Sequence, residues 1–86
     1  MRDKIQRRQY VVTVHADEEM DEDDLSIFDI ESAILSGEII ERQRERKTRE
    51  VKYLVRGQTA DARQLLVAVT KFGRSGTLVI ITVYVE

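Results

Sequence analysis

The chain has few side chains suited to proton transfer or to covalent chemistry. It contains one histidine, His15, and no cysteine. An imidazole titrates near neutral pH, so His15 is suited to exchange a proton with a 2′-hydroxyl or with a leaving oxygen. The alternative is that His15 is a structural residue that bonds to the backbone at the start of a helix. Tyr84 is a second candidate for proton transfer, although a tyrosine in an apolar run more often belongs to the core, with its hydroxyl at the rim.

Basic side chains are concentrated between residues 42 and 56. This stretch holds seven basic and two acidic residues. Guanidinium and ammonium groups contact phosphates and stabilise negative charge that develops in a transition state. The basic residues are Arg42, Arg44, Arg46, Lys47, Arg49, Lys52 and Arg56. They predict an RNA-binding site, a docking site for an acidic partner, or simply a solvated hairpin.

Residue type and spacing exclude several other classes of site. With one histidine and no cysteine, the chain has no set of transition-metal ligands. The acidic run is not an EF-hand, because counting from Asp17 puts Glu22 at the required glycine and Phe28 at the bidentate glutamate. The GRSG segment at residues 73–76 lacks the spacing and the lysine of a phosphate-binding loop, and no serine lies in a nucleophile elbow. We therefore expect no metal and no cofactor, and any catalysis to be metal-independent.

Acidic and basic residues lie in different parts of the chain. The formal net charge is −2, but residues 11–41 contain eleven acidic and no basic residues, whereas residues 42–74 contain ten basic and three acidic ones. Such asymmetry bears on the choice of partner more than on the fold. No apolar stretch is long enough for a signal peptide or a membrane span. We therefore expect a cytoplasmic protein that does not contact the membrane.

A strand and a short helix must position His15. The β-branched and aromatic run Tyr10–Val14 predicts the strand. The residues from His15 onward favour a helix, with Ala16 and Met20 four residues apart on its buried face. His15 is therefore expected at the junction of the two elements.

A second helix has clear start and stop signals. Ser26 is an N-cap residue, and Asp29 lies at the spacing of a capping box. Apolar residues at three- and four-residue spacing then predict a helix over residues 27–36. Gly37 is expected to end the helix in the left-handed conformation.

The C-terminal half has the period-two pattern of strands. Residues 38–46 and 49–56 are expected to form a hairpin with a highly polar end. Residues 64–72 and 77–85 are nearly continuous in apolar residues, which predicts two central strands. Each pair of neighbouring strands is joined by a short connection, so an antiparallel meander is expected.

Together these elements predict one domain over residues 1–86. The fold class is α+β, with two N-terminal helices packed on one face of a mainly antiparallel sheet of about five strands, in the order β-α-α-β-β-β-β. The expected core residues are Val12, Val14, Met20, Ile30, Ile34, Val67, Val69, Ile80 and Val83.

A longer pattern resembles a known family. It combines His15-Ala16 after an opening strand, Met20, the helix start Ser26-Ile27-x-Asp29-Ile30, and the segments AIL-x-GEIIE and IITVY. Together these segments are similar to a small bacterial family of domains of unknown function related to the BrnT and RelE toxins. One difference is that Glu18-Glu19-Met20 stands where many members have an arginine beside the methionine.

The resemblance implies a RelE-like fold and a toxin-like component of a bacterial type II toxin–antitoxin system, in the form of an RNA-cleaving protein. Its implied partners are an antitoxin protein and RNA or the ribosome. By the same resemblance, His15, Arg56 and Tyr84 are the candidate catalytic residues of an endoribonuclease. The alternative is a non-catalytic interaction module or homodimer that uses its basic hairpin to bind an acidic partner.

Overall fold

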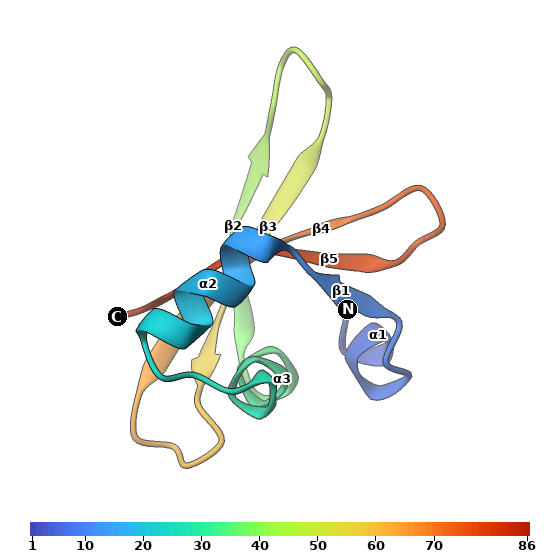
Figure 1. Cartoon of the computed structure of the whole chain (residues 1–86). Helices are drawn as coiled ribbons and strands as arrows, with labels where there is room; N and C mark the ends of the chain where they lie inside the picture. Colours follow the sequence, from blue (N-terminus) through green and yellow to red (C-terminus); the bar gives the residue numbers. More distant parts are fainter.

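A computed structural model describes residues 1–86 as a five-stranded sheet with helices packed against it (Figure 1). The spatial order of the strands is β1-β5-β4-β3-β2. The last four strands form the expected antiparallel meander, whereas β1 runs parallel to β5, so the sheet is mixed. The elements are α1 (Arg2–Gln6), β1 (Tyr10–Val12), α2 (Val14–Glu22), α3 (Ile27–Ser36), β2 (Glu38–Arg44), β3 (Val51–Gln58), β4 (Leu65–Phe72) and β5 (Leu78–Val85). The expected α+β class is therefore confirmed.

The helix α1 has no counterpart in the sequence prediction. It is held by one buried side chain, Ile5, which is 2% exposed. Its Arg2 guanidinium donates a hydrogen bond to the carbonyl oxygen of Gly37 at 3.0 Å. A five-residue helix with one buried apolar residue has no periodic pattern, so only its tertiary contacts define it.

The strand β1 ends earlier than predicted, because Thr13 caps the next helix. The Thr13 hydroxyl accepts a hydrogen bond from the Ala16 N–H at 3.1 Å and donates one to the carbonyl oxygen of Ile81 at 2.8 Å. Val14 is thus the first residue of α2, where its side chain is 75% exposed. The prediction that Val14 belongs to a strand and to the core was wrong.

The helix α3 has the predicted bounds and the predicted N-terminal cap. Ser26 accepts from the Asp29 N–H, and the Asp29 carboxylate accepts from the Ser26 N–H at 2.9 Å. The prediction of a left-handed Gly37 was wrong, because its φ of −93° and ψ of −166° are extended. A Cβ at Gly37 would lie less than 3.0 Å from the carbonyl oxygens of Ala33 and Arg56, so glycine is required here by close packing.

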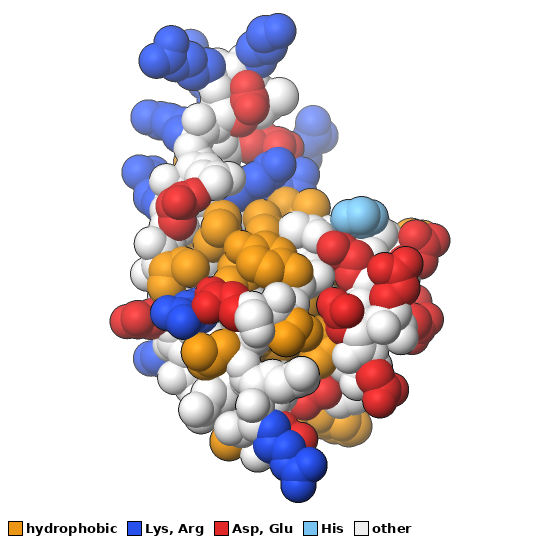
Figure 2. Space-filling model, turned by 90° about the vertical axis from the view of Figure 1, so that its left-hand side faces the viewer, with side chains coloured by type: hydrophobic (Ala, Val, Ile, Leu, Met, Phe, Trp, Pro, Cys, Tyr) orange, Lys and Arg blue, Asp and Glu red, His pale blue; other side chains and the backbone are white.

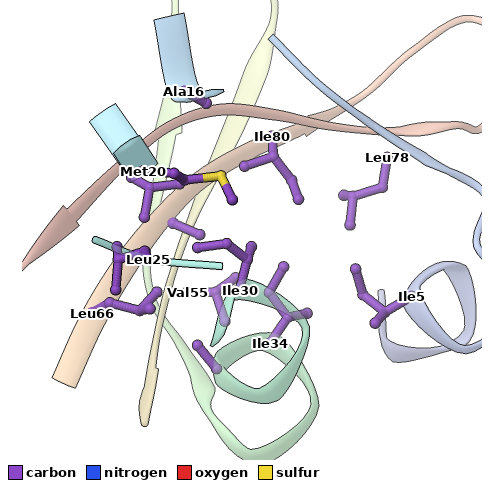
Figure 3. Packing of buried hydrophobic residues seen from close by; sticks show 13 residues of the cluster. Ile5, Ala16, Met20, Leu25, Ile30, Ile34, Val55, Leu66, Leu78 and Ile80 are labelled. Carbon is purple, nitrogen blue, oxygen red and sulfur yellow. The ribbon is translucent and has the colours of Figure 1, made fainter. Parts of the chain in front are cut away.

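The core lies between the helices and one face of the sheet (Figure 3). Met20 from α2 and Ile30 and Ile34 from α3 meet Leu66 and Ile80 from the sheet. The expected core residues Met20, Ile30, Ile34, Ile80 and Val83 are confirmed.

The other expected core residues have different environments. Val67 is buried but lies outside the cluster, because its neighbours Leu66 and Ala68 point to the helices and Val67 therefore points to the opposite face. Val12 and Val69 are only partly buried.

No helix is long and apolar enough to cross a membrane.

Candidate functional site

The sheet has one face away from the core cluster, which we call the open face. Val55, Ala68 and Val83 are cross-strand neighbours and point into the core. Since side chains alternate along a strand, the two adjacent rows point the other way. These rows are Arg56, Val67 and Tyr84, and Leu54, Val69 and Thr82.

Two candidate catalytic residues, Arg56 and Tyr84, lie in one of these rows. Val67 pairs with both of them, so their backbones are two strand spacings apart, about 10 Å. The side chain of Tyr84 is 42% exposed. Arg56 forms an ion pair with Glu86, with 2.8 Å between Nη2 and Oε2, and its Nε is buried without a partner. The register of the sheet therefore brings Arg56 and Tyr84 to one surface, with Glu86 beside them.

The third candidate, His15, lies near the start of α2 and contacts a carboxylate. Its Nε2 is 3.4 Å from Oε1 of Glu19, and the two side chains are 68% and 24% exposed, respectively. The same Glu19 oxygen accepts hydrogen bonds from the hydroxyl of Thr82 and from the Val83 N–H, the latter at 3.1 Å. Glu19 thus orients the His15 imidazole and joins it to β5, at the margin of the open face.

Sequence reasoning missed both acidic partners. Glu19 is four residues after His15 on a helix, and this spacing is a signal that was present in the sequence. Glu86 had no such signal, because its contact with Arg56 depends on the register of three strands.

The basic hairpin, defined here as residues 42–52, projects from the body of the sheet (Figure 1). Its six basic residues are those expected to bind RNA or a partner: Arg42, Arg44, Arg46, Lys47, Arg49 and Lys52. All are exposed except Lys52, which is half-buried, and none takes part in any of the five ion pairs of the structure. Of the two hairpin carboxylates, Glu50 is paired with Lys71 at 3.0 Å. The positive charge of the hairpin is therefore largely uncompensated.

The six cations point to both sides of the hairpin. Arg42 pairs with Tyr53 across the strands, on the side of the core, whereas Lys52 precedes Tyr53 and points to the side of the open face. At the base of the hairpin, Tyr53 and Phe72 make an edge-to-face contact with ring centroids 6.0 Å apart. The structure does not gather the cations around His15; it presents them on a separate, projecting ribbon.

The helix α2, which we call the acidic helix, lies beside the open face and away from the basic hairpin. Figure 2 shows a hydrophobic area between the basic side chains of the hairpin and the acidic side chains of α2. No three histidine, aspartate or glutamate side chains lie together in a way that could hold a metal ion. The chemistry available to this surface is that of one imidazole, one phenol and many charged groups.

A family model for a domain of unknown function, DUF4258, matches residues 12–85. The chain belongs to this family. The match confirms the expected resemblance to a small family of domains of unknown function. The matched residues include every candidate site residue of this DUF4258 domain, whereas α1 lies before the matched residues. Comparisons with curated proteins and with solved structures found no match.

Proposed function

We propose that this DUF4258 protein is an RNA-directed, toxin-like component of a bacterial type II toxin–antitoxin system, with RNA held by the basic hairpin. The observation that supports this proposal is the set of six basic side chains on a projecting ribbon, none of them in an ion pair. Unpaired cations release counterions and gain affinity when they meet phosphates. An RNA strand is a polyphosphate long enough to meet several of them at once.

In the proposed cleavage reaction, the 2′-oxygen of a ribose attacks the adjacent phosphorus and the bond to the 5′-oxygen breaks. His15 accepts the proton of the 2′-hydroxyl, and Tyr84 donates a proton to the departing 5′-oxygen. Glu19 keeps the imidazole in position, since it is fixed by Thr82 and Val83. No metal takes part in this scheme.

Arg56 would stabilise the negative charge of the phosphate. In the structure its guanidinium is already paired with Glu86, so an RNA phosphate must compete with that carboxylate. Replacing Glu86 with glutamine would therefore strengthen RNA binding if Arg56 contacts the phosphate.

Salt dependence tests the RNA-binding part of the proposal. If about four phosphates are neutralised, log Kd for a single strand changes with log salt with a slope near 3. Binding of a fluorescent RNA is measured between about 50 and 200 mM salt, the range in which counterion release has a large effect. The double variant Arg44→Glu/Lys52→Glu should bind at least tenfold more weakly. Absence of binding by the unmodified protein at the lowest salt would refute the proposal.

A matched control separates the effect of the hairpin on RNA affinity from the effect of net charge. Arg7 and Arg63 are exposed, lie outside the hairpin and are each paired with an aspartate. The variant Arg7→Glu/Arg63→Glu changes the net charge by the same amount as the hairpin variant. It should retain most of the RNA affinity; an equal loss would show that binding follows net charge alone.

Induced expression in a bacterial host tests the toxin-like activity. Growth should stop with the unmodified protein and continue with His15→Ala, provided that circular dichroism shows both proteins to be folded. If growth stops equally with His15→Ala, His15 has no role in the chemistry.

The acidic helix favours a second candidate function. The exposed carboxylates Asp17, Glu18, Asp21 and Glu22 lie on the same helix as His15 and repel RNA. A non-catalytic module that docks an acidic protein, such as an antitoxin, uses the hairpin without bringing a phosphate to His15. In that case the variant Arg44→Glu/Lys52→Glu no longer binds the partner protein, and RNA does not compete with the partner for the hairpin.

A further inference from the structure

Two aromatic side chains lie on the side of the sheet that faces the helices, at the base of the projecting hairpin. Phe72 pairs with Leu78 and points to the same side as this core residue, yet its side chain is 43% exposed. Tyr53 is half-buried beside it, in the edge-to-face contact described above. Figure 1 shows that the β2–β3 hairpin extends beyond α2 and α3. An aromatic surface is therefore open to solvent where the helices end.

The same side of the hairpin carries two arginines and no carboxylate. Arg42 is directly opposite Tyr53, and Arg44 is two residues farther along β2, about 7 Å away along the strand. Since side chains alternate along a strand, the two hairpin carboxylates, Glu45 and Glu50, point to the opposite side. Neither arginine takes part in an ion pair. We call this set of four residues the aromatic platform: Arg42, Arg44, Tyr53 and Phe72.

This combination of side chains fits a single-stranded nucleic acid. The faces of unpaired bases stack on aromatic rings, while cations beside the rings hold the phosphates of the backbone. In a duplex the bases stack on one another, so they are not available to a ring on a protein surface. An acidic protein segment would satisfy the arginines but would leave the two rings without a matching planar group.

We propose that the aromatic platform holds single-stranded RNA, with bases stacked on Phe72 and Tyr53 and phosphates bound by the two arginines. The inference deepens the RNA binding proposed above and rests on it. The platform and the open face are on opposite sides of the sheet, so the platform contributes to RNA affinity and takes no part in bond cleavage. Single strands are preferred to duplexes, with little preference among the bases, because every base has a face that stacks.

The two phenylalanines of the chain provide a matched pair of variants. Phe28 is 65% exposed on α3, outside the platform. Phe72→Leu and Phe28→Leu both remove a ring and keep an apolar side chain. Phe72→Leu should weaken the binding of a fluorescent single-stranded RNA by about fivefold or more, since one stacked base is lost. Phe28→Leu should leave the Kd unchanged, and equal affinities of the two variants would overturn the proposal.

An RNA of the same length without bases separates stacking from a general effect on the shape of the hairpin. This abasic strand keeps the phosphates but offers nothing to stack on the ring. The unmodified protein should bind the abasic strand more weakly than the strand with bases. Phe72→Leu should bind the abasic strand as tightly as the unmodified protein does. If Phe72→Leu weakens the binding of both strands equally, the ring only supports the hairpin and the proposal is wrong.

Single charge reversals test which side of the hairpin holds the strand. Arg44→Glu and Lys52→Glu change the net charge equally, but Arg44 lies on the side of the platform and Lys52 on the opposite side. Arg44→Glu should weaken single-strand binding about tenfold, because it removes a charged hydrogen bond to a phosphate, and Lys52→Glu should weaken it less. Equal losses would contradict the platform. Absence of RNA binding by the unmodified protein would overturn both the proposed function and the platform, whereas unchanged binding by Phe72→Leu would overturn the platform alone.

Discussion

Replacing Gly57 with alanine should destabilise the protein through a backbone clash. A Cβ at Gly57 would lie less than 3.0 Å from the carbonyl oxygen, the carbonyl carbon and the Cα of Ala33. These are backbone atoms of α3, which cannot rotate away, so the helix must move from the sheet. Overpacking of this kind costs about 3 kcal/mol, at the upper end of the usual range. Loss of glycine flexibility in the unfolded chain returns less than about 1 kcal/mol, which leaves a net loss of about 2 kcal/mol.

The matched control is Gly73→Ala in the turn between β4 and β5. There the nearest neighbour of a new Cβ is the carbonyl oxygen of Thr77 at 3.5 Å, an ordinary contact. This variant should be neutral or slightly stabilised. Urea unfolding at 25 °C gives the free energies, and a loss of 2 kcal/mol corresponds to a fall in Tm of about 8–16 °C. Equal stability of the two variants would show that α3 is not held against β3 at Gly57.

Three further changes test the core, a helix cap and one titration. Ile80→Ala should cost about 2–5 kcal/mol in urea unfolding, since Ile80 is 0% exposed; a loss below that range would place it outside the core. Ser26→Ala should cost about 1 kcal/mol by removing the cap of α3, and an unchanged unfolding midpoint would contradict this. Burial and the hydrogen bond to Glu31 raise the pKa of Tyr10 from 10.0 to about 12, so the folded state retains this proton. The contribution of Tyr10 to the free energy of unfolding should therefore be fully present below pH 10 and be lost as the pH rises to about 12. In this interval the free energy of unfolding of Tyr10→Phe should change less with pH than that of the unmodified protein; parallel pH profiles of the two proteins would exclude the Tyr10 contribution.

Local signals in the sequence predicted several elements well. The start of α3 follows from Ser26 and Asp29, whose side chains act within one turn of the helix. The strands of the meander were predicted to within two residues, because the period-two pattern extends along most of each strand. The error at Val14 arose where two local signals compete, since the β-branched run Val11–Val14 contains a threonine, Thr13, that is also a good helix cap.

Features that depend on distant parts of the chain were not predictable in this way. The helix α1 exists because Ile5 meets the core, and the close packing at Gly37 requires knowledge of β3. In the candidate site, the pairing of Arg56 with Glu86 requires the register of the sheet. The pairing of His15 with Glu19 was within reach, because it needs only the helical spacing.

The position of β5 has a consequence for the order of folding. It comes after all the other elements in sequence, yet it lies between β1 and β4 in the sheet, and Thr13 bonds to Ile81, 68 residues away. Before β5 leaves the ribosome, β1 has no strand to pair with, and the core lacks Leu78, Ile80 and Val83. Contacts of such long range make folding slow compared with a helical protein of the same size. A nascent chain released before β5 is complete would therefore expose the apolar faces of α2 and α3 and become a substrate for chaperones and proteases.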